Sequence, residues 1–197
     1  YGDIHPQAGQ ISFAGVEASG ENNAFQKAKI GYFMQESTIF MNSLAFNLTL
    51  GEEYSVEQMK NVLNEVHLSY LLERYDLMDE TVNLVDHLSG GEKQKIACAS
   101  VSVTDPDIII LDEPSSNLDK QSTKDLRNII ELWKKQGKTI IIAEHRLYYL
   151  QGLLDHIFYM ESGRIVDCYD DESKFYEQHK SKIRPFGGWS PGCTTII

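Results

Sequence analysis

The second half of the chain predicts an α/β protein built on a parallel β-sheet. Two largely apolar runs of strand length, Asp107–Leu111 and Lys138–Ala143, are typical of strands that are buried on both faces. Between them, Ser122–Lys135 carries apolar side chains at helical spacing and stops before Gly137. A strand, a helix and a second strand in this order favour parallel pairing of the two strands.

The rest of the chain divides into shorter elements. Further strands are expected at Gly9–Gly15, Ile30–Met34, His156–Met160 and Arg164–Val166. Further helices are expected at Ser55–Arg74, Gly90–Val103 and Leu147–Leu154. Ser55 is expected to cap its helix without a full capping box, because the nearest acid follows only two residues later.

The connecting segments are polar or rich in glycine and proline. We expect a loop or short helix at Asn22–Lys29 and a turn-like stretch that runs up to Asn47. Residues beyond about Ile183 are Gly- and Pro-rich, which indicates a linker or a ragged end.

The composition is that of a globular chain that is poorly suited to binding nucleic acid. Of its 197 residues 42% are hydrophobic and 24% are charged, and the formal net charge is -11. A nucleic-acid surface needs clustered Lys and Arg, so this acidity disfavours one. The three cysteines are widely spaced and predict reduced thiols. No apolar run approaches the roughly 18 residues of a membrane span, so the chain is not expected to span a membrane itself.

The segment Leu88–Gln94 predicts an anion-binding turn at the start of a helix. Gly90 and Gly91 allow a ligand to approach the backbone closely. The first helical turn offers free N–H groups and the positive end of the helix dipole, and Ser89 adds a hydroxyl donor. Such a turn is by itself more often an ordinary loop, so its meaning depends on the segments that follow.

Two acidic residues, Asp112 and Glu113, stand at the end of the next buried strand. Ligands of α/β sheets bind at this end of the strands, where unpaired carboxylates are costly to bury. A magnesium ion beside phosphates offsets that cost, and we expect Asp112 to hold it directly or through water. Glu113 is then expected to act as a general base on the attacking water. The alternative is an acidic strand end that makes an ordinary turn.

His145 directly follows the next buried strand, at the sheet edge where Asp112 and Glu113 are also expected. There it can contact a γ-phosphate and the attacking water. A single His is more often structural or exposed. The glycine turn, the two acids and His145 follow one another in this order. Together they favour a functional rather than a structural role for His145.

In this order the segments resemble the nucleotide-binding domain of ATP-binding-cassette (ABC) proteins. The matching segments are Leu88–Gln94 with the signature motif, Ile108–Glu113 with the Walker B strand, Ser116–Asp119 with the D-loop, His145 with the switch histidine, and Ile30–Gln35 with the strand that ends in the Q-loop glutamine. The resemblance runs from about Gly9 to Val166. It implies an α/β, P-loop NTPase-like (RecA-like) fold: a parallel sheet with an inserted helical subdomain.

The resemblance implies an ATPase that binds ATP and Mg²⁺ and works as a head-to-tail dimer. Its catalytic residues are Glu113, His145 and Gln35, and its metal ligands are Asp112 and Gln35. Its ATP-binding residues are Ser89, Gly90, Gly91, Glu92 and Asp119, which serve the nucleotide held by a second ATPase domain or lie at the interface with it. Gln35 also connects the site to a transmembrane transporter subunit. The chain is accordingly expected in the cytoplasm, peripheral on the inner face of the cell membrane.

The chain departs from the family pattern because it contains no phosphate-binding loop of the form G-x-x-x-x-G-K-[S/T]. Gly15 and Gly20 have the glycine spacing, but Glu21 and Asn22 follow them. We expect that the true loop lies upstream of Tyr1 or has been lost, which leaves the fold incomplete at the N-terminus. The loop's N–H groups and Lys anchor the triphosphate, so this chain alone is expected neither to bind ATP tightly nor to hydrolyse it.

Within the family, Ala143–Leu150 is similar to the switch region of energy-coupling-factor ATPases, which drive uptake of vitamins and transition-metal ions. Two alternatives stay open: a DNA-repair or chromosome-associated ATPase, and a non-catalytic ABC-like interaction module. The short separation of Gln35 and Leu88, without a heptad run between them, argues against the first alternative. The intact catalytic residues argue against the second.

Four segments are expected along the chain. They are residues 1–35 as the remnant of an N-terminal β region through the Q-loop, 36–100 as the helical subdomain with the signature motif, 101–182 as the RecA-like core, and 183–197 as a linker or tail. Phe40–Gly51 resembles the stretch in transporters where the helical subdomain meets the membrane subunit.

Overall fold

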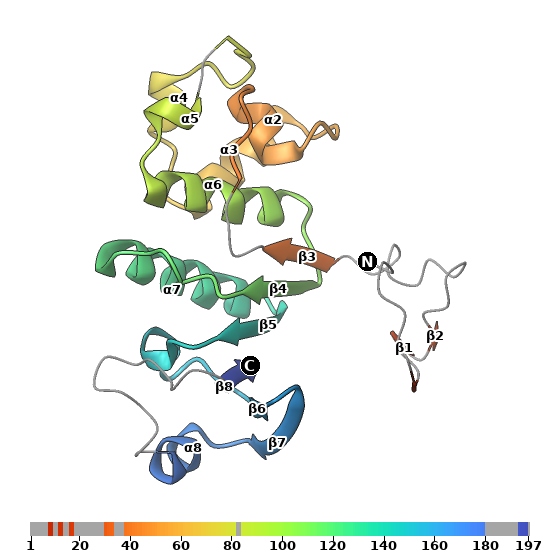
Figure 1. Ribbon diagram of the computed structural model, residues 1–197. Coiled ribbons are helices and arrows are strands. Elements are labelled where there is room, and N and C mark those ends of the chain that lie inside the picture. Colours follow the sequence, from red (N-terminus) through yellow and green to blue (C-terminus); the bar gives the residue numbers. More distant parts are fainter. Residues whose placement is uncertain are drawn as a thin grey trace.

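The computed structural model describes residues 8–9, 12–13, 16–17, 30–33, 38–81, 84–179 and 193–196. Its centre is a sheet in which β4 (Ile108–Asp112) pairs in parallel with β5 (Thr139–Glu144) on one side and with β3 (Ile30–Phe33) on the other. Ile109 and Leu111 of β4 are fully buried. The predicted α/β fold with a parallel sheet is therefore confirmed (Figure 1).

The other half of the sheet is antiparallel. The strand order is β3-β4-β5-β8-β6-β7, with β6 at Ile157–Glu161 and β7 at Arg164–Tyr169. Strand β8 (Cys193–Ile196) pairs antiparallel with both β5 and β6. Predicting only a linker or tail beyond about Ile183 was therefore wrong for β8. Strand β8 lies between β5 and β6, which do not pair with each other. It supplies hydrogen-bond partners to the backbone N–H and C=O groups of both strands.

Two helices pack against the parallel strands. Helix α6 (Gly90–Val103) lies against β3, and α7 (Lys120–Lys135) lies against β5. A β-carbon on Gly31 of β3 would stand 2.5 Å from a side-chain carbon of Val101, so the close approach of β3 and α6 requires glycine there. Trp133 of α7 is buried and donates its indole N–H to the Ser102 hydroxyl at 2.9 Å, which joins the two helices.

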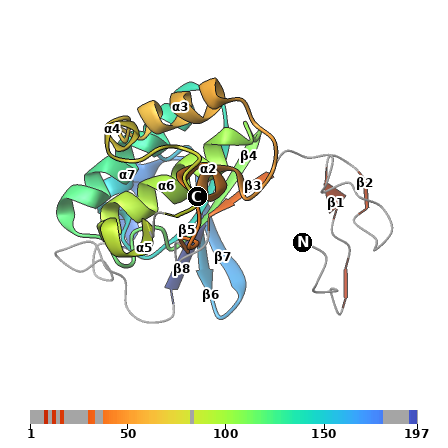
Figure 2. The same cartoon turned by 90° about the horizontal axis from the view of Figure 1, so that it is seen from above.

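Four short helices lie on the far side of α6 from the sheet (Figure 1). They are α2 (Leu44–Thr49), α3 (Val56–Glu65), α4 (Leu71–Arg74) and α5 (Leu84–His87). Helices α2 and α3 pack directly on α6 (Figure 2). The fully buried leucines of this region are Leu44, Leu48, Leu63, Leu68, Leu71 and Leu84. Their shared burial gives the short helices the tertiary support that isolated helices of this length lack.

The predicted helix Ser55–Arg74 is in fact the pair α3 and α4. The chain turns at His67, which has a positive φ of 57° that no continuous helix allows. Ser55 does form a full capping box, because Gln58, three residues later, returns the hydrogen bond at 2.9 Å. The prediction of an incomplete box was wrong because it considered only acidic partners.

Two other local predictions also need correction. The turn-like stretch up to Asn47 contains the start of α2, whose first turn is capped by Ser43. The predicted helix Leu147–Leu154 is limited to the 3₁₀ turn η1 (Leu147–Leu150), because Gly152 has a φ of 80°.

The remaining described elements are β1 (Ser12–Phe13) and β2 (Val16–Glu17), which pair antiparallel, and α8 (Glu172–Gln178), which was not predicted. The predicted segment Asn22–Lys29 lies outside the described residues, as does most of the predicted strand Gly9–Gly15. Across the part of the chain that the structure describes, no helix has the length and apolarity needed to cross a membrane. Apart from β8 within its last segment, the division into four segments stays a prediction.

Candidate functional site

The turn that begins α6 is closed by a reciprocal capping box. Ser89 is the N-cap residue, and its hydroxyl accepts a hydrogen bond from the Glu92 backbone N–H at 3.3 Å. The Glu92 carboxylate accepts in return from the Ser89 N–H and from the Ser89 hydroxyl, both at 2.7 Å. Two orphan donors of the helix start are thereby satisfied, which fixes the conformation of the turn.

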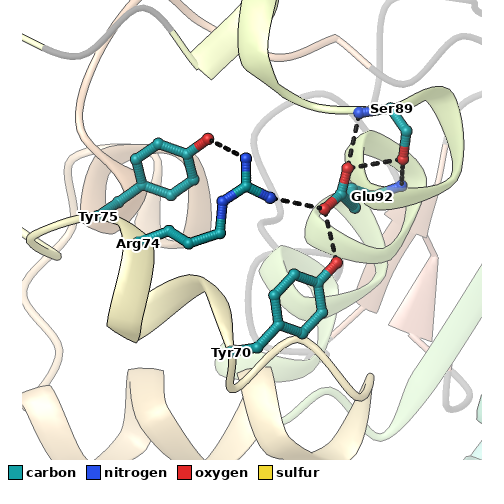
Figure 3. Close-up of polar contacts among 5 residues, drawn as sticks. All are labelled: Tyr70, Arg74, Tyr75, Ser89 and Glu92. Carbon is teal, nitrogen blue, oxygen red and sulfur yellow. Dashed lines mark hydrogen bonds and ion pairs between the residues drawn. The ribbon is translucent and has the colours of Figure 1, made fainter.

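The Glu92 carboxylate is also held from the helical region by Tyr70 and Arg74 (Figure 3). The Tyr70 hydroxyl donates to it at 2.6 Å, and the Arg74 guanidinium lies 3.7 Å away. Burial would raise the pKa of Glu92, but hydrogen bonds from Tyr70 and Ser89 outweigh it and lower the pKa. Burial and the bond to Glu92 raise the pKa of Tyr70 to about 12, so the hydroxyl stays a donor.

A hollow of about 540 Å³ opens beside this turn. It is lined by the first turn of α6, by the loop after β4, and by the first residues of α7. A β-carbon built on Gly90 meets no atom within 4 Å, so the backbone of Gly90 is open to an incoming group. Gly91 is tighter, since its added β-carbon would lie 2.7 Å from the Ser122 hydroxyl. The predicted residues Ser89, Gly90, Gly91 and Asp119 thus surround one space.

Asp119 has a structural task at the far side of the hollow. It caps α7, and its carboxylate accepts from the Ser122 N–H at 2.7 Å. This hydrogen bond lowers the pKa of Asp119 below its usual range. The carboxylate is therefore negative at neutral pH and fixed in direction beside the hollow that Asp119 lines.

The second group of predicted residues meets at the C-terminal ends of β4 and β5. The ring Nε2 of His145 lies 2.9 Å from Oε1 of Glu113, and both side chains are about one third exposed. Glu113 has a positive φ of 42°, and its N–H donates to the Ala143 carbonyl at 2.8 Å. A non-glycine residue in this region of backbone space is uncommon and is over-determined here by its neighbours. The expected proximity of these two residues is confirmed.

Asp112 is the last residue of β4 and is half-buried. Among the described residues, its carboxylate makes no hydrogen bond or ion pair. In the same part of the chain, no cluster of three or more His, Cys, Asp or Glu could hold a metal ion.

Gln35 lies outside the described residues, so the structure gives no position for its side chain. No role was predicted from the sequence for four polar residues near the site: Tyr70, Arg74, Gln94 and Glu144. Gln94 donates to the Pro114 carbonyl at 2.6 Å and so joins α6 to the loop after Glu113. Glu144 could have been noticed as a carboxylate next to His145, but its bond to the Ser115 N–H, 29 residues away, is visible only in the structure.

Comparison with known proteins agrees with this geometry. The family model described as "ABC transporter" matches residues 1–116. A putative ABC transporter ATP-binding protein of Treponema denticola is 44% identical over 124 residues, which is 63% of this chain and 24% of the relative. The energy-coupling factor transporter ATP-binding protein EcfA2 of Methanospirillum hungatei is 32% identical over 188 residues, covering 90% of this chain and 45% of the relative.

A solved bacterial Atm1-family ABC exporter with ATP bound has the same fold. It superposes with a TM-score of 0.73 at 23% identity, and the match covers 88% of this chain and 31% of the exporter chain. The chain spans less than half the length of the two curated relatives. The matched family model, the relatives and the motif residues at the sheet edge together show that this chain belongs to the ABC transporter family, among its ATP-binding proteins.

Proposed function

We propose that the chain forms the catalytic part of an ABC transporter ATPase, with ATP as its substrate. The observation that carries this proposal is the contact between Glu113 and His145 at the carboxyl end of the parallel sheet, 2.9 Å between Oε1 and Nε2. A carboxylate and an imidazole in contact at this edge can together orient a water molecule and accept its proton.

In the proposed reaction, Glu113 takes a proton from a water molecule as the water oxygen attacks the γ-phosphorus of ATP. The bond between that phosphorus and the β–γ bridging oxygen breaks, which gives ADP and phosphate. His145 lies against Glu113 and holds the carboxylate and the γ-phosphate in line. A magnesium ion bound at Asp112 would neutralise charge on the phosphate oxygens. Gln35 is proposed to contact the metal and the γ-phosphate.

The turn at Ser89, Gly90, Gly91 and Glu92 is proposed to bind the nucleotide of a second ATPase domain in a head-to-tail dimer. The open backbone at Gly90 and the hollow beside it support this assignment. Asp119, at the rim of the same hollow, is proposed to face the partner domain. The positive end of α6 suits a phosphate group, since its dipole and N–H groups both favour an anion.

The transported substrate is proposed to be a vitamin or a transition-metal ion, moved by a transmembrane subunit on which this chain sits from the cytoplasmic side. The similarity of Ala143–Leu150 to energy-coupling-factor ATPases supports this substrate class. The 32% identity over 188 residues to a protein named as an energy-coupling factor transporter ATP-binding protein agrees with that resemblance.

The test is calorimetric titration with MgATP of the 197-residue chain and of a chain that also carries a phosphate-binding loop upstream of Tyr1. We expect tight binding and turnover only for the extended chain. Glu113→Gln should then lower its turnover by about 10²- to 10⁴-fold, the contribution of a general base. Glu161→Gln, at the exposed end of β6, is the control and should leave turnover unchanged. Full turnover by the extended Glu113→Gln variant would refute the assignment.

A further inference from the structure

We propose that Glu144 is a positioning residue that fixes the geometry of the Glu113–His145 pair, an inference that rests on the proposed ATP hydrolysis. Glu144 is the last residue of β5 and is only 2% exposed. Buried carboxylates are rare unless they are hydrogen-bonded, because desolvation of the charge is costly. The contacts of Glu144 explain its burial and point to its task.

Four donors converge on the Glu144 carboxylate. Oε1 accepts from the His145 N–H at 2.8 Å and from the Arg146 N–H at 3.0 Å. Oε2 accepts from the Tyr149 hydroxyl at 2.9 Å and from the Ser115 N–H at 3.3 Å. Three of the four donors are backbone N–H groups, so the carboxylate fixes the path of the chain as well as the direction of side chains.

These donors belong to separate segments of the chain. Oε1 holds the turn that carries His145, while Oε2 ties the loop after Glu113 to η1. A further hydrogen bond joins the turn that carries His145 to the loop after Glu113, because the Arg146 guanidinium donates to the Ser115 carbonyl at 3.2 Å. One buried side chain therefore sets the spacing between the segment that presents the general base and the segment that presents the histidine.

The arrangement matters for Glu113 because its loop has an unusual backbone conformation. Glu113 has a φ of 42°, and its carbonyl accepts from the Ser116 N–H at 3.1 Å in a tight turn. Ser115 is part of that turn and is buried. Loss of the Glu144 bonds would free the turn to relax. A displacement of about 1 Å in a catalytic group can lower a rate by roughly 10²-fold.

Tyr149 is the one side chain among the four donors, and it offers a milder probe. It is 4% exposed, and burial together with the negative charge of Glu144 raises its pKa well above the usual range. Its hydroxyl is therefore always protonated and always a donor to Glu144. Removal of this hydroxyl weakens the carboxylate's support and leaves the three backbone bonds in place.

The test compares Glu144→Gln and Tyr149→Phe with the matched controls Glu161→Gln and Tyr148→Phe. Glu161 also ends a strand but is exposed, and Tyr148 is 46% exposed beside Tyr149. In the 197-residue chain, the NMR signal of the His145 ring is assigned by its loss in His145→Gln. We expect that signal to shift in Glu144→Gln and in Tyr149→Phe, and to keep its position in the controls Glu161→Gln and Tyr148→Phe.

The second readout is ATP turnover by the chain that also carries a phosphate-binding loop upstream of Tyr1. Glu144→Gln should lower kcat by about 10- to 100-fold, since it misplaces both catalytic groups. KM for ATP should change less than about threefold, because the ATP-binding residues are untouched. Tyr149→Phe should give a smaller fall in kcat in the same direction. A residue that only stabilises the fold would lower the melting temperature without this selective loss of kcat.

An unchanged His145 signal and an unchanged kcat in Glu144→Gln would overturn the inference. If that variant does not fold, Tyr149→Phe decides the question by the same two readouts. Failure of the proposed function is recognised separately, since turnover would then survive Glu113→Gln. If Glu113→Gln loses turnover while Glu144→Gln keeps normal turnover, the proposed function stands and only the positioning role of Glu144 is refuted.

Discussion

Two carboxylates of the site, Glu92 and Glu144, are both saturated with hydrogen bonds but in opposite surroundings. Glu92 lies in the first turn of α6, where its Ser89 and Tyr70 partners are exposed. Glu144 is buried at the end of β5, where backbone N–H groups supply most of its partners. The exposed network leaves an open hollow beside it, whereas the buried network joins the loop after Glu113 to the turn that carries His145.

One chain thus carries an exposed turn, proposed to bind nucleotide, and a buried hydrogen-bond network beside the proposed catalytic pair. Ser89 and Tyr70 are exposed to water, which can satisfy these groups when they leave Glu92, so a ligand at Ser89 can compete with the capping box at low cost. Glu144, Ser115 and Tyr149 are buried, so loss of these bonds leaves buried polar groups unpaired. Mutations in the two networks should therefore differ in size and in kind.

The largest expected effect is on stability at the buried network. Glu144→Ala leaves three backbone N–H groups and the Tyr149 hydroxyl without their acceptor, which should lower the free energy of unfolding by about 3 kcal/mol. Urea unfolding followed by circular dichroism measures this change. Glu161→Ala is the exposed control and should not change the unfolding midpoint. Equal midpoints for the two variants would show that Glu144 is not a structural centre.

A smaller effect is expected at the exposed turn. Ser89→Ala removes an N-cap and should lower the free energy of unfolding by about 1 kcal/mol. Ser55→Ala is a matched control, because Ser55 forms the same type of capping box at the start of α3. Both variants should lose similar stability. Only Ser89→Ala should weaken ATP turnover in the proposed head-to-tail dimer of chains that also carry the phosphate-binding loop. A similar loss of turnover in both would remove the ligand role of Ser89.

Gly90→Ala should separate stability from function. A β-carbon there meets no atom within 4 Å, and alanine favours the helix, so stability should rise by up to about 1 kcal/mol. Turnover in the complete dimer should nevertheless fall, because the methyl group projects into space proposed for a phosphate. Thermal unfolding and steady-state turnover are the two measurements. A more stable variant with full turnover would place the nucleotide elsewhere.

The smallest effect concerns pH at Glu92. Its folded-state pKa is lowered from the ordinary value of 4.5, so its charge stabilises the fold above about that pH. The contribution is lost as pH falls through the lowered folded-state pKa. Glu92→Gln has no such charge, so the two unfolding curves should differ at pH 7 and converge at acidic pH. A difference that stays constant with pH would show that the charge of Glu92 adds nothing to the capping box.

Local sequence patterns were sufficient wherever neighbours along the chain decide the structure. The apolar runs around Ile109 and Ile142 do form parallel strands, and the glycine pair does begin α6. The position of Glu113 and His145 at one sheet edge followed from the rule that parallel strands end together. Errors arose where a short element depends on distant packing, as at α2 and at the break between α3 and α4.

The sequence by itself determined the α/β class and the family, because both are written in contiguous motifs, and the same motifs supplied the candidate site residues as predictions. Only the tertiary structure decided that β8 pairs between β5 and β6, that Tyr70 reaches Glu92, and that Glu144 clamps the loop after Glu113. Each of these contacts joins residues far apart in the chain. Their formation depends on how whole elements pack, and no local periodicity or propensity encodes that arrangement.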